Sequence, residues 1–354
     1  MIFIDGGQKS GSGTIVRDAV PYSVLMGKEL HLENIRVKRD KPGLRPQHLK
    51  GVHAAAQICL GKLEGAEVGS QRIRFQPGRT MRGGQFTWDI GTAGSAVMLA
   101  LGVIPLGLFA EKPSIYDITG GLFQDFAPSA HHFEYILLPL LKSMGCNLDF
   151  EIIQPGYVPK GEGRIRIRTV PMRASLKPLT LEDQGRVLEI KGIALSSVLK
   201  ERKVSERMAG ECRRTLKDRG YDSRVEIYYD TKETPVYRRP AIQAGASLTI
   251  WARTDTACLL GSDKVGAPKR TAEWIGRETV KNLFEDLDSG ATVDIHVADQ
   301  LIPFAALAGG WSTYRVSKIT EHIESRLWLV EKILGAKTEV KGKWIRIKGI
   351  GYMS

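Results

Sequence analysis

The sequence of 354 residues contains few cysteines, and they lie far apart. Cys59, Cys146, Cys212 and Cys258 form no CxxC pair and no closely spaced set with histidine. Structural zinc sites and disulfide frameworks depend on such spacing, so the sequence argues against both. Dispersed free cysteines fit a reducing compartment, and we expect a cytoplasmic location.

The sequence also lacks a signal-peptide pattern and has only one long uncharged run. Its start, MIFIDGG, shows no basic segment followed by an apolar one. Residues 91–110, GTAGSAVMLALGVIPLGLFA, carry no charge over a length that could cross a bilayer. Pro105 and several glycines interrupt this run. We therefore expect a buried helix that breaks near Pro105, and no membrane association.

Acidic residues are fewer than basic residues. Lysine and arginine number 51 against 39 aspartates and glutamates, which gives a formal net charge of +12. This excess favours a polyanionic partner such as nucleic acid or a nucleotide, although solubility alone would also explain it. The hydrophobic fraction of 42% is enough for a full core.

Strand and helix patterns alternate along the chain, which predicts an α/β fold of the α+β type. A short strand at the start is followed by a helix over 14–27, a strand over 30–37 and a helix over 45–61. Similar units recur later, so we expect a large domain of repeated modules rather than one doubly wound sheet. Between 186 and 281 the pattern becomes a compact βαββα set. We predict an inserted small α/β domain there, and a discontinuous large domain over 1–185 and 282–354.

Two stretches near the start of the chain suit phosphate binding. The glycine-rich joint IDGGQKSGSGTIVRD, 4–18, can bring backbone N–H groups to a phosphate at a helix N-terminus, but it lacks the P-loop spacing and a structural turn explains it equally well. Residues 35–50 concentrate cations around one acid, Asp40, so they suit phosphate contact or form a solvated basic loop. The cations are Arg36, Lys38, Arg39, Lys41, Arg45 and Lys50.

Residues 296–310, HVADQLIPFAALAGG, begin with polar side chains and continue as an apolar segment. We place Asp299 and Gln300 at the end of a polar turn, where they could take ribose hydroxyls or a base edge, while His296 could stack on a base. The alternative is that Asp299 is simply a helix N-cap. The pattern alone does not separate the two interpretations.

A histidine stands at the start of the last predicted helix, 319–334. Its apolar stripe is Ile319, Ile323, Leu327, Val330 and Leu334, and His322 lies off that stripe in the first turn if Thr320 is the N-cap. The helix dipole there disfavours imidazolium, so a neutral ring could attack a phosphorus centre. An ordinary helix-start histidine would show the same spacing.

Together these stretches resemble the RNA 3'-terminal phosphate cyclase family, in the family's order and over nearly the whole chain. The resembling motifs are IDG with the glycine-rich joint and Arg17, IRVKRDKPGLRPQHLKGVHAAAQIC, EGAEVGSQRIRFQPG, GTAGS, GGLFQDFAPS, HVADQLIPFAALAGG and the closing histidine helix. The resemblance implies three βαβαββ-like modules in the large domain. It also implies an ATP-dependent, ligase-type enzyme that acts on RNA 3'-phosphate ends with a divalent metal.

The resemblance implies a three-step reaction and a set of site residues. The histidine attacks the α-phosphorus of ATP to form histidine-AMP, the AMP passes to an RNA 3'-phosphate, and the ribose 2'-hydroxyl then displaces AMP to leave a 2',3'-cyclic phosphate. His322 matches the nucleophile. Adenosine-binding positions match Asp299, Gln300, His296, Pro128 and Phe133. Phosphate-binding positions match Arg17, Arg36, Arg39, Gln47 and His48.

The chain departs from the family pattern in its first joint. The family reads close to EGGGQ there, whereas this chain has SGSGT, so Ser10 replaces a glutamate associated with metal and nucleotide, and Thr14 replaces a glutamine. A hydroxyl supplies no negative charge to a divalent cation, so metal use is in question. Two rival interpretations follow: a cyclase-like protein that only binds RNA or a ribonucleoprotein, or an adenylyltransferase with another phosphate acceptor.

Overall fold

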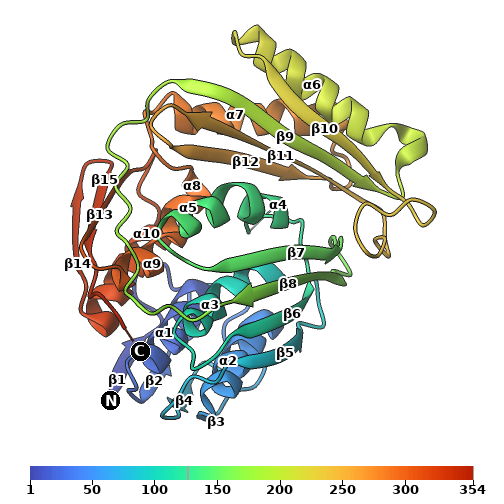
Figure 1. Ribbon diagram of the computed structural model, residues 1–354. Coiled ribbons are helices and arrows are strands. Elements are labelled where there is room, and N and C mark those ends of the chain that lie inside the picture. The colour runs from blue at the N-terminus through green and yellow to red at the C-terminus, as the bar shows by residue number, and fades with distance from the viewer. Residues whose placement is uncertain (126, 354) are drawn as a thin grey trace.

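The computed structural model describes residues 1–125 and 127–353, and it confirms the mixed α/β class (Figure 1). The first sheet has the strand order β1-β2-β4-β3, with β1 and β2 parallel and the other pairs antiparallel. Its elements are β1 (Ile2–Asp5), α1 (Gly13–Leu25), β2 (Leu30–Glu33), α2 (Pro46–Cys59), β3 (Lys62–Glu64) and β4 (Ile73–Gln76). The element order is βαβαββ.

The second sheet repeats this order and these directions as β5-β6-β8-β7. Its elements are β5 (Gly84–Asp89), α3 (Ala96–Leu108), β6 (Ser114–Gly120), α4 (Ala130–His132), η1 (Phe133–Leu137), α5 (Leu138–Ser143), β7 (Leu148–Gln154) and β8 (Gly163–Thr169). The segment from α4 to α5 is not one regular α-helix, because a π-helical turn, η1, occupies its middle.

The third sheet, β13-β15-β14, is antiparallel and has only three full strands. Thr180 forms a parallel bridge to Thr313 of β13. In the other two sheets the first strand, β1 or β5, pairs in the same parallel way with the second strand. The elements are α8 (Ile295–Gln300), α9 (Ile302–Leu307), β13 (Trp311–Arg315), α10 (Glu321–Leu329), η3 (Val330–Leu334), β14 (Lys337–Lys341) and β15 (Trp344–Lys348). The third unit is therefore a shortened version of the first two.

The remaining sheet, β10-β9-β11-β12, lies in the chain between Thr180 and α8. Helices α6 and α7 pack on it and on each other (Figure 1). Trp251 of β11 stacks on Tyr135 of η1 at a ring distance of 4.6 Å. The elements are β9 (Val187–Ser197), η2 (Lys200–Arg202), α6 (Val204–Asp218), β10 (Ser223–Asp230), β11 (Gly245–Thr254), β12 (Leu259–Val265) and α7 (Ala272–Leu287). The domain boundaries at 186 and 281 stay a prediction.

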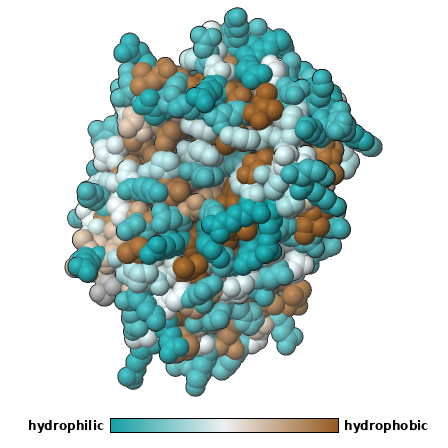
Figure 2. Space-filling view, turned by 45° about the vertical axis from the view of Figure 1, so that its right-hand side comes forward, coloured by the Kyte–Doolittle hydropathy of each residue, from teal (hydrophilic) through white to brown (hydrophobic). Residues whose placement is uncertain are grey.

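Helix α3 forms the centre of the core, against α1 and α2. Ser95 caps it by accepting a hydrogen bond from the Met98 N–H, and nearly all of its side chains are buried. The prediction that the helix breaks near Pro105 is wrong, because it continues to Leu108 with Pro105 inside it. No helix among the described residues has the length and apolarity needed to cross a membrane. Figure 2 shows hydrophilic residues over most of one face, with apolar side chains in small groups.

Candidate functional site

A pocket of about 210 Å³ lies where α1, α3, α8 and α10 meet the loop before α4. Its lining combines cationic, acidic, hydroxyl and imidazole side chains with a few apolar ones. The lining residues are Thr14, Arg17, Met98, Ala127, Pro128, Ile295, His296, Asp299, Gln300, Thr320 and His322. Segments more than 300 residues apart in the chain therefore share one cavity.

His322 stands in the first turn of α10, as the sequence predicts. Thr320 is the N-cap, and its hydroxyl accepts a hydrogen bond from the Ile323 N–H. The Nδ1 of His322 lies 3.0 Å from the Thr14 hydroxyl of α1. Burial lowers the pKa of His322, and the charges of Arg17, Arg326 and Arg39 lower it further, while Asp299 acts in the opposite sense. The ring is therefore neutral at pH 7.

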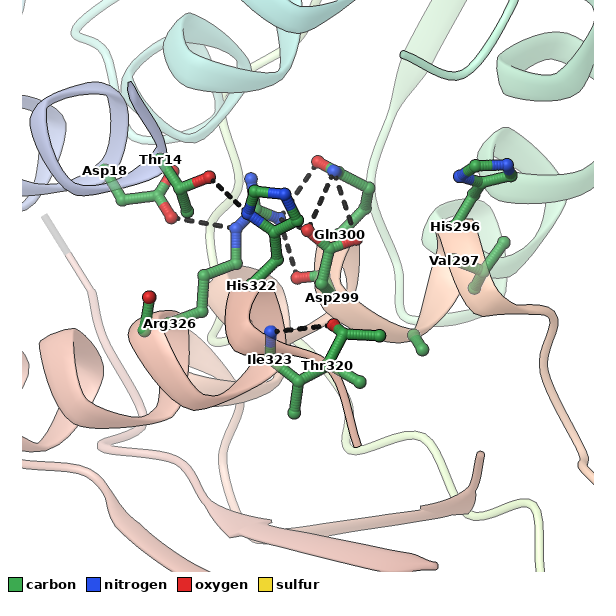
Figure 3. A network of polar contacts seen from close by, with 12 residues as sticks. Thr14, Asp18, His296, Val297, Asp299, Gln300, Thr320, His322, Ile323 and Arg326 are labelled. Atoms are coloured by element: carbon green, nitrogen blue, oxygen red, sulfur yellow. Dashed lines mark hydrogen bonds and ion pairs between the residues drawn. The ribbon is translucent and has the colours of Figure 1, made fainter. Parts of the chain in front are cut away.

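A buried arginine, Arg326, joins α10 to α1 and α8 behind the histidine (Figure 3). Its Nε lies 2.9 Å from the Asp18 carboxylate, and one terminal nitrogen donates to the Asp299 carbonyl at 2.6 Å and to the Gln300 side-chain oxygen at 2.9 Å. Burial alone would lower the pKa of Arg326, but Asp18 and Asp299 raise it above its ordinary value. This guanidinium orients the two predicted adenosine-binding residues.

Sequence reasoning missed Arg326 and Asp18. The available signal was spacing, because Arg326 follows His322 by four residues and so lies on the same side of α10. A cation at that position faces the site rather than solvent, and its side chain is only 2% exposed. A buried arginine needs a carboxylate partner, and Asp18 stands one residue after Arg17.

Asp299 and Gln300 lie in the last turn of α8 rather than in a polar turn, so that part of the prediction is wrong. The N-cap is Asp294, not Asp299, because its carboxylate accepts hydrogen bonds from the His296 and Val297 N–H groups. The helix begins earlier than the pattern indicates since this cap satisfies its first donors. The other Asp294 oxygen lies 3.1 Å from His132 Nε2, and both side chains are fully buried.

The predicted adenosine-binding residues divide into two groups. His296 and Pro128 line the pocket together with Asp299 and Gln300, and the His296 ring meets that of His132 edge-on at 5.6 Å. Phe133 does not join them. It is buried in η1, and its ring packs against Phe150 at 4.9 Å, outside the pocket lining formed by the described residues.

Arg17, Gln47 and His48 lie together beside the pocket. Arg17 lines it directly, and all three line a smaller cavity of about 20 Å³ that adjoins it. Gly13 allows this arrangement, because a Cβ there would overlap His48 Nε2. Burial, with Arg17, Arg36 and Arg45 nearby, lowers the pKa of His48 to about 3. Burial lowers that of Arg17 to about 10. His48 is therefore neutral.

Arg36 and Arg39 stand at the outer side of this group. Arg36 has a left-handed backbone, with φ 57°, and donates to the carbonyls of Lys41 at 2.6 Å and Gly43 at 2.9 Å. Arg39 is exposed, and its charge is near enough to lower the pKa of His322. The Lys38 ammonium donates to the Lys9 carbonyl at 2.8 Å, which ties this basic loop to the glycine-rich joint.

Comparison with known proteins decides the relationship. The family model described as "RNA 3'-terminal phosphate cyclase" matches residues 8–340. The chain belongs to the RNA 3'-terminal phosphate cyclase family. Relatives named RNA 3'-terminal phosphate cyclase include one from Archaeoglobus fulgidus, 37% identical over 98% of this chain and 100% of its own. Another is from Pyrobaculum aerophilum, 34% identical over 99% and 98% respectively.

Within the RNA 3'-terminal phosphate cyclase family, the position of Ser10 bears on metal use. Its hydroxyl is buried between the hydroxyls of Ser12, at 2.9 Å, and Ser325 of α10, at 2.8 Å. No three His, Cys, Asp or Glu side chains among the described residues are grouped to hold a metal ion. The residues present therefore do not fit a protein-built metal site.

Proposed function

We propose that this protein is an ATP-dependent RNA 3'-terminal phosphate cyclase with His322 as its nucleophile. The observation that carries the proposal is a neutral imidazole at a helix N-terminus, in one pocket with Arg17 and the Asp299–Gln300 pair. A neutral ring nitrogen can attack phosphorus, and guanidinium groups can balance the phosphate charge. The relatives are named for RNA 3'-terminal phosphate cyclisation, which supports the reaction, while the use of ATP and the nucleophile are our proposal.

The first step forms a bond between His322 Nε2 and the α-phosphorus of ATP and breaks the bond from that phosphorus to the bridging oxygen. Pyrophosphate leaves. We assign the proton of the neutral ring to Nδ1, which donates to the Thr14 hydroxyl 3.0 Å away, so that the Nε2 lone pair is free. Attack leaves a positive charge on the ring, and the Asp299 carboxylate stabilises it.

The next two steps return His322 to its starting state. An oxygen of the RNA 3'-phosphate attacks the AMP phosphorus, and the bond to Nε2 breaks. The 2'-hydroxyl of the same ribose then attacks the 3'-phosphate, loses its proton and expels AMP, which leaves a 2',3'-cyclic phosphate. We assign the phosphate charges to Arg17, Arg36 and Arg39, with Gln47 and His48 beside them, and the adenosine to Asp299, Gln300, His296 and Pro128.

The choice of acceptor tests this function against its rivals. The protein is incubated with ATP and oligonucleotides ending in a 3'-phosphate, a 3'-hydroxyl or a 5'-phosphate. Pyrophosphate release and conversion of only the RNA 3'-phosphate to a cyclic end support the proposal. Release of pyrophosphate with adenylate on another end identifies an adenylyltransferase. Binding of RNA without release of pyrophosphate from ATP identifies a non-catalytic relative.

The titration of His322 gives a direct prediction. Because its pKa is lowered from the ordinary 6.5, the ring loses its proton at a pH below 6.5 and stays neutral above that pH. Nitrogen NMR of labelled histidine in the nucleotide-free protein should show this midpoint, with the signal assigned by its loss in His322→Ala. A midpoint at or above pH 6.5 would contradict the neutral-nucleophile assignment.

Thr14 should set the tautomer of that ring. Thr14→Val keeps the side-chain shape and removes the hydroxyl oxygen, so the His322 ring loses its preference for a proton on Nδ1. Adenylylation of His322 should then slow about tenfold, which corresponds to the free energy of one hydrogen bond. Thr14→Ser, which keeps a hydroxyl, is the matched control and should stay near wild type. Nitrogen NMR reports the tautomer in each variant. An unchanged tautomer in Thr14→Val excludes this role.

A further inference from the structure

The outer face of the third sheet combines exposed cations with tryptophans. In the β14-β15-β13 register, Lys337 pairs with Lys348 and Lys348 with Trp311, while Lys341 pairs with Trp344. Side chains alternate between the faces of a sheet, so these residues share one face with Arg346. The residues between them, such as Ile345 and Ile347, are fully buried on the other face. The same register places Glu339, Thr313 and Arg315 on this face as well. We call the whole set, with Trp311, Lys337, Lys341, Trp344, Arg346 and Lys348, the outer sheet face.

This face is hollowed, and its tryptophans are partly exposed. A groove of about 360 Å³ lies at one part of it, lined by Lys341, Trp344 and Arg346 together with Thr313, Glu182 and Glu339. Both tryptophans are partly exposed, and the Arg346 guanidinium covers the Trp311 ring at 4.6 Å. The three lysines are exposed, whereas the acids at the groove are Glu339, which pairs with Arg346 at 2.8 Å, and Glu182. The free charge of the face is therefore positive.

Lysines along an edge strand have an ordinary explanation, since they prevent pairing with other sheets. That explanation covers Lys337 and Lys341 of β14. It does not cover Trp344 and Lys348, which lie on the central strand β15 and are paired on both sides. Aromatic rings between cations on a sheet are the arrangement that binds single-stranded nucleic acid, because bases stack on the rings and phosphates meet the cations.

We propose that the outer sheet face binds a single-stranded segment of the RNA, upstream of the end that enters the His322 pocket. The sheet belongs to the same unit as the pocket, which lies on the side of its inner face: Tyr314 of β13, buried on that inner face, donates to the Ala298 carbonyl of α8 at 2.9 Å. Strand β13 also leads through Thr320 into α10. The assignment of the RNA to the pocket rests on the proposed function, whereas binding to the face can be measured without catalysis. Bases would stack on Trp344 while Lys341 and Lys348 take phosphates.

Binding of labelled RNA by fluorescence anisotropy tests this face without ATP. The substitution pair Lys341→Glu and Lys348→Glu should weaken binding of a 20-nucleotide single strand at least about tenfold and lower the salt slope by about 2. Trp344→Leu should weaken it about tenfold through lost stacking. The matched control, Lys28→Glu with Lys112→Glu, makes the same charge change at exposed lysines elsewhere and should have little effect.

Three outcomes would overturn the proposal. Equal weakening by the control pair would mean that only net charge matters. Wild-type affinity in both sheet variants would remove the face from RNA binding. Tighter binding of duplex RNA than of single strands would exclude stacking. Covalent AMP formation, measured in parallel without RNA, should be unchanged in the sheet variants, so a failure of the cyclase proposal would be seen separately.

Discussion

His322→Ala should abolish covalent attachment of AMP to the protein. With labelled ATP and a divalent metal, the wild-type protein should retain label after denaturation, and the variant should fall at least about a thousandfold, to background. The reason is chemical, because His322 is the proposed nucleophile, and the charges of both Arg17 and Asp299 act on its imidazole within the pocket. When a nucleophile is removed, neighbouring side chains do not take over its role, so the rate of the covalent step falls by factors of this size.

His296→Ala is the matched control for this experiment. His296 lines the same pocket and is also an imidazole, but its proposed role is to pack on the adenine. The variant should still carry label and should need a higher ATP concentration to reach half of its maximum. Label that persists in His322→Ala would refute the nucleophile assignment, and label lost only in His296→Ala would transfer the role to that residue.

The sequence was a good guide to the fold where patterns are local. Caps and periodicity placed the start of α10 correctly, with Thr320 as N-cap and the buried stripe on Ile323, Leu327 and Val330. The last part of the predicted helix, to Leu334, is instead the π-helical η3. Prediction failed where tertiary packing outweighed a local preference. Pro105 is a helix breaker in isolation, but α3 is buried against α1 and α2, and this burial holds the helix through to Leu108. The π turn at η1 has no pattern that periodicity would detect.

The site was predictable only in part, for a related reason. Residues with a motif of their own, such as Arg17, Asp299 and His322, were found and do line one pocket. Residues that act through packing, such as Asp18 and Ser325, carry no motif, and their partners lie about 300 positions away. Resemblance supplied Phe133, and the structure places its ring elsewhere.

Arg326→Met should be among the most destabilising substitutions in the chain. Methionine fills similar space, but it leaves the Asp18 carboxylate, 6% exposed, without the guanidinium that lies 2.9 Å from it. Removing one partner of a buried ion pair costs about 3–5 kcal/mol. Burial already raises the pKa of Asp18 with Arg326 in place, and after the substitution only the charge of Arg17 would still oppose that effect. Urea unfolding should show a loss of this size, and ATP affinity should fall as well, since Arg326 also holds Asp299 and Gln300.

An ion pair at the surface serves as the matched control, because it has the same charges as the Arg326–Asp18 pair but is not buried. Arg207 and Glu273 are 2.7 Å apart with side chains 48% and 36% exposed, so Arg207→Met should cost less than about 1 kcal/mol because solvent screens that pair. Combining Arg326→Met with Asp18→Asn should restore part of the lost stability, since the uncompensated charge is then gone. If Arg326→Met costs no more than Arg207→Met, the ion pair is not what holds α1, α8 and α10 around His322. In that case the pocket geometry rests on apolar packing alone.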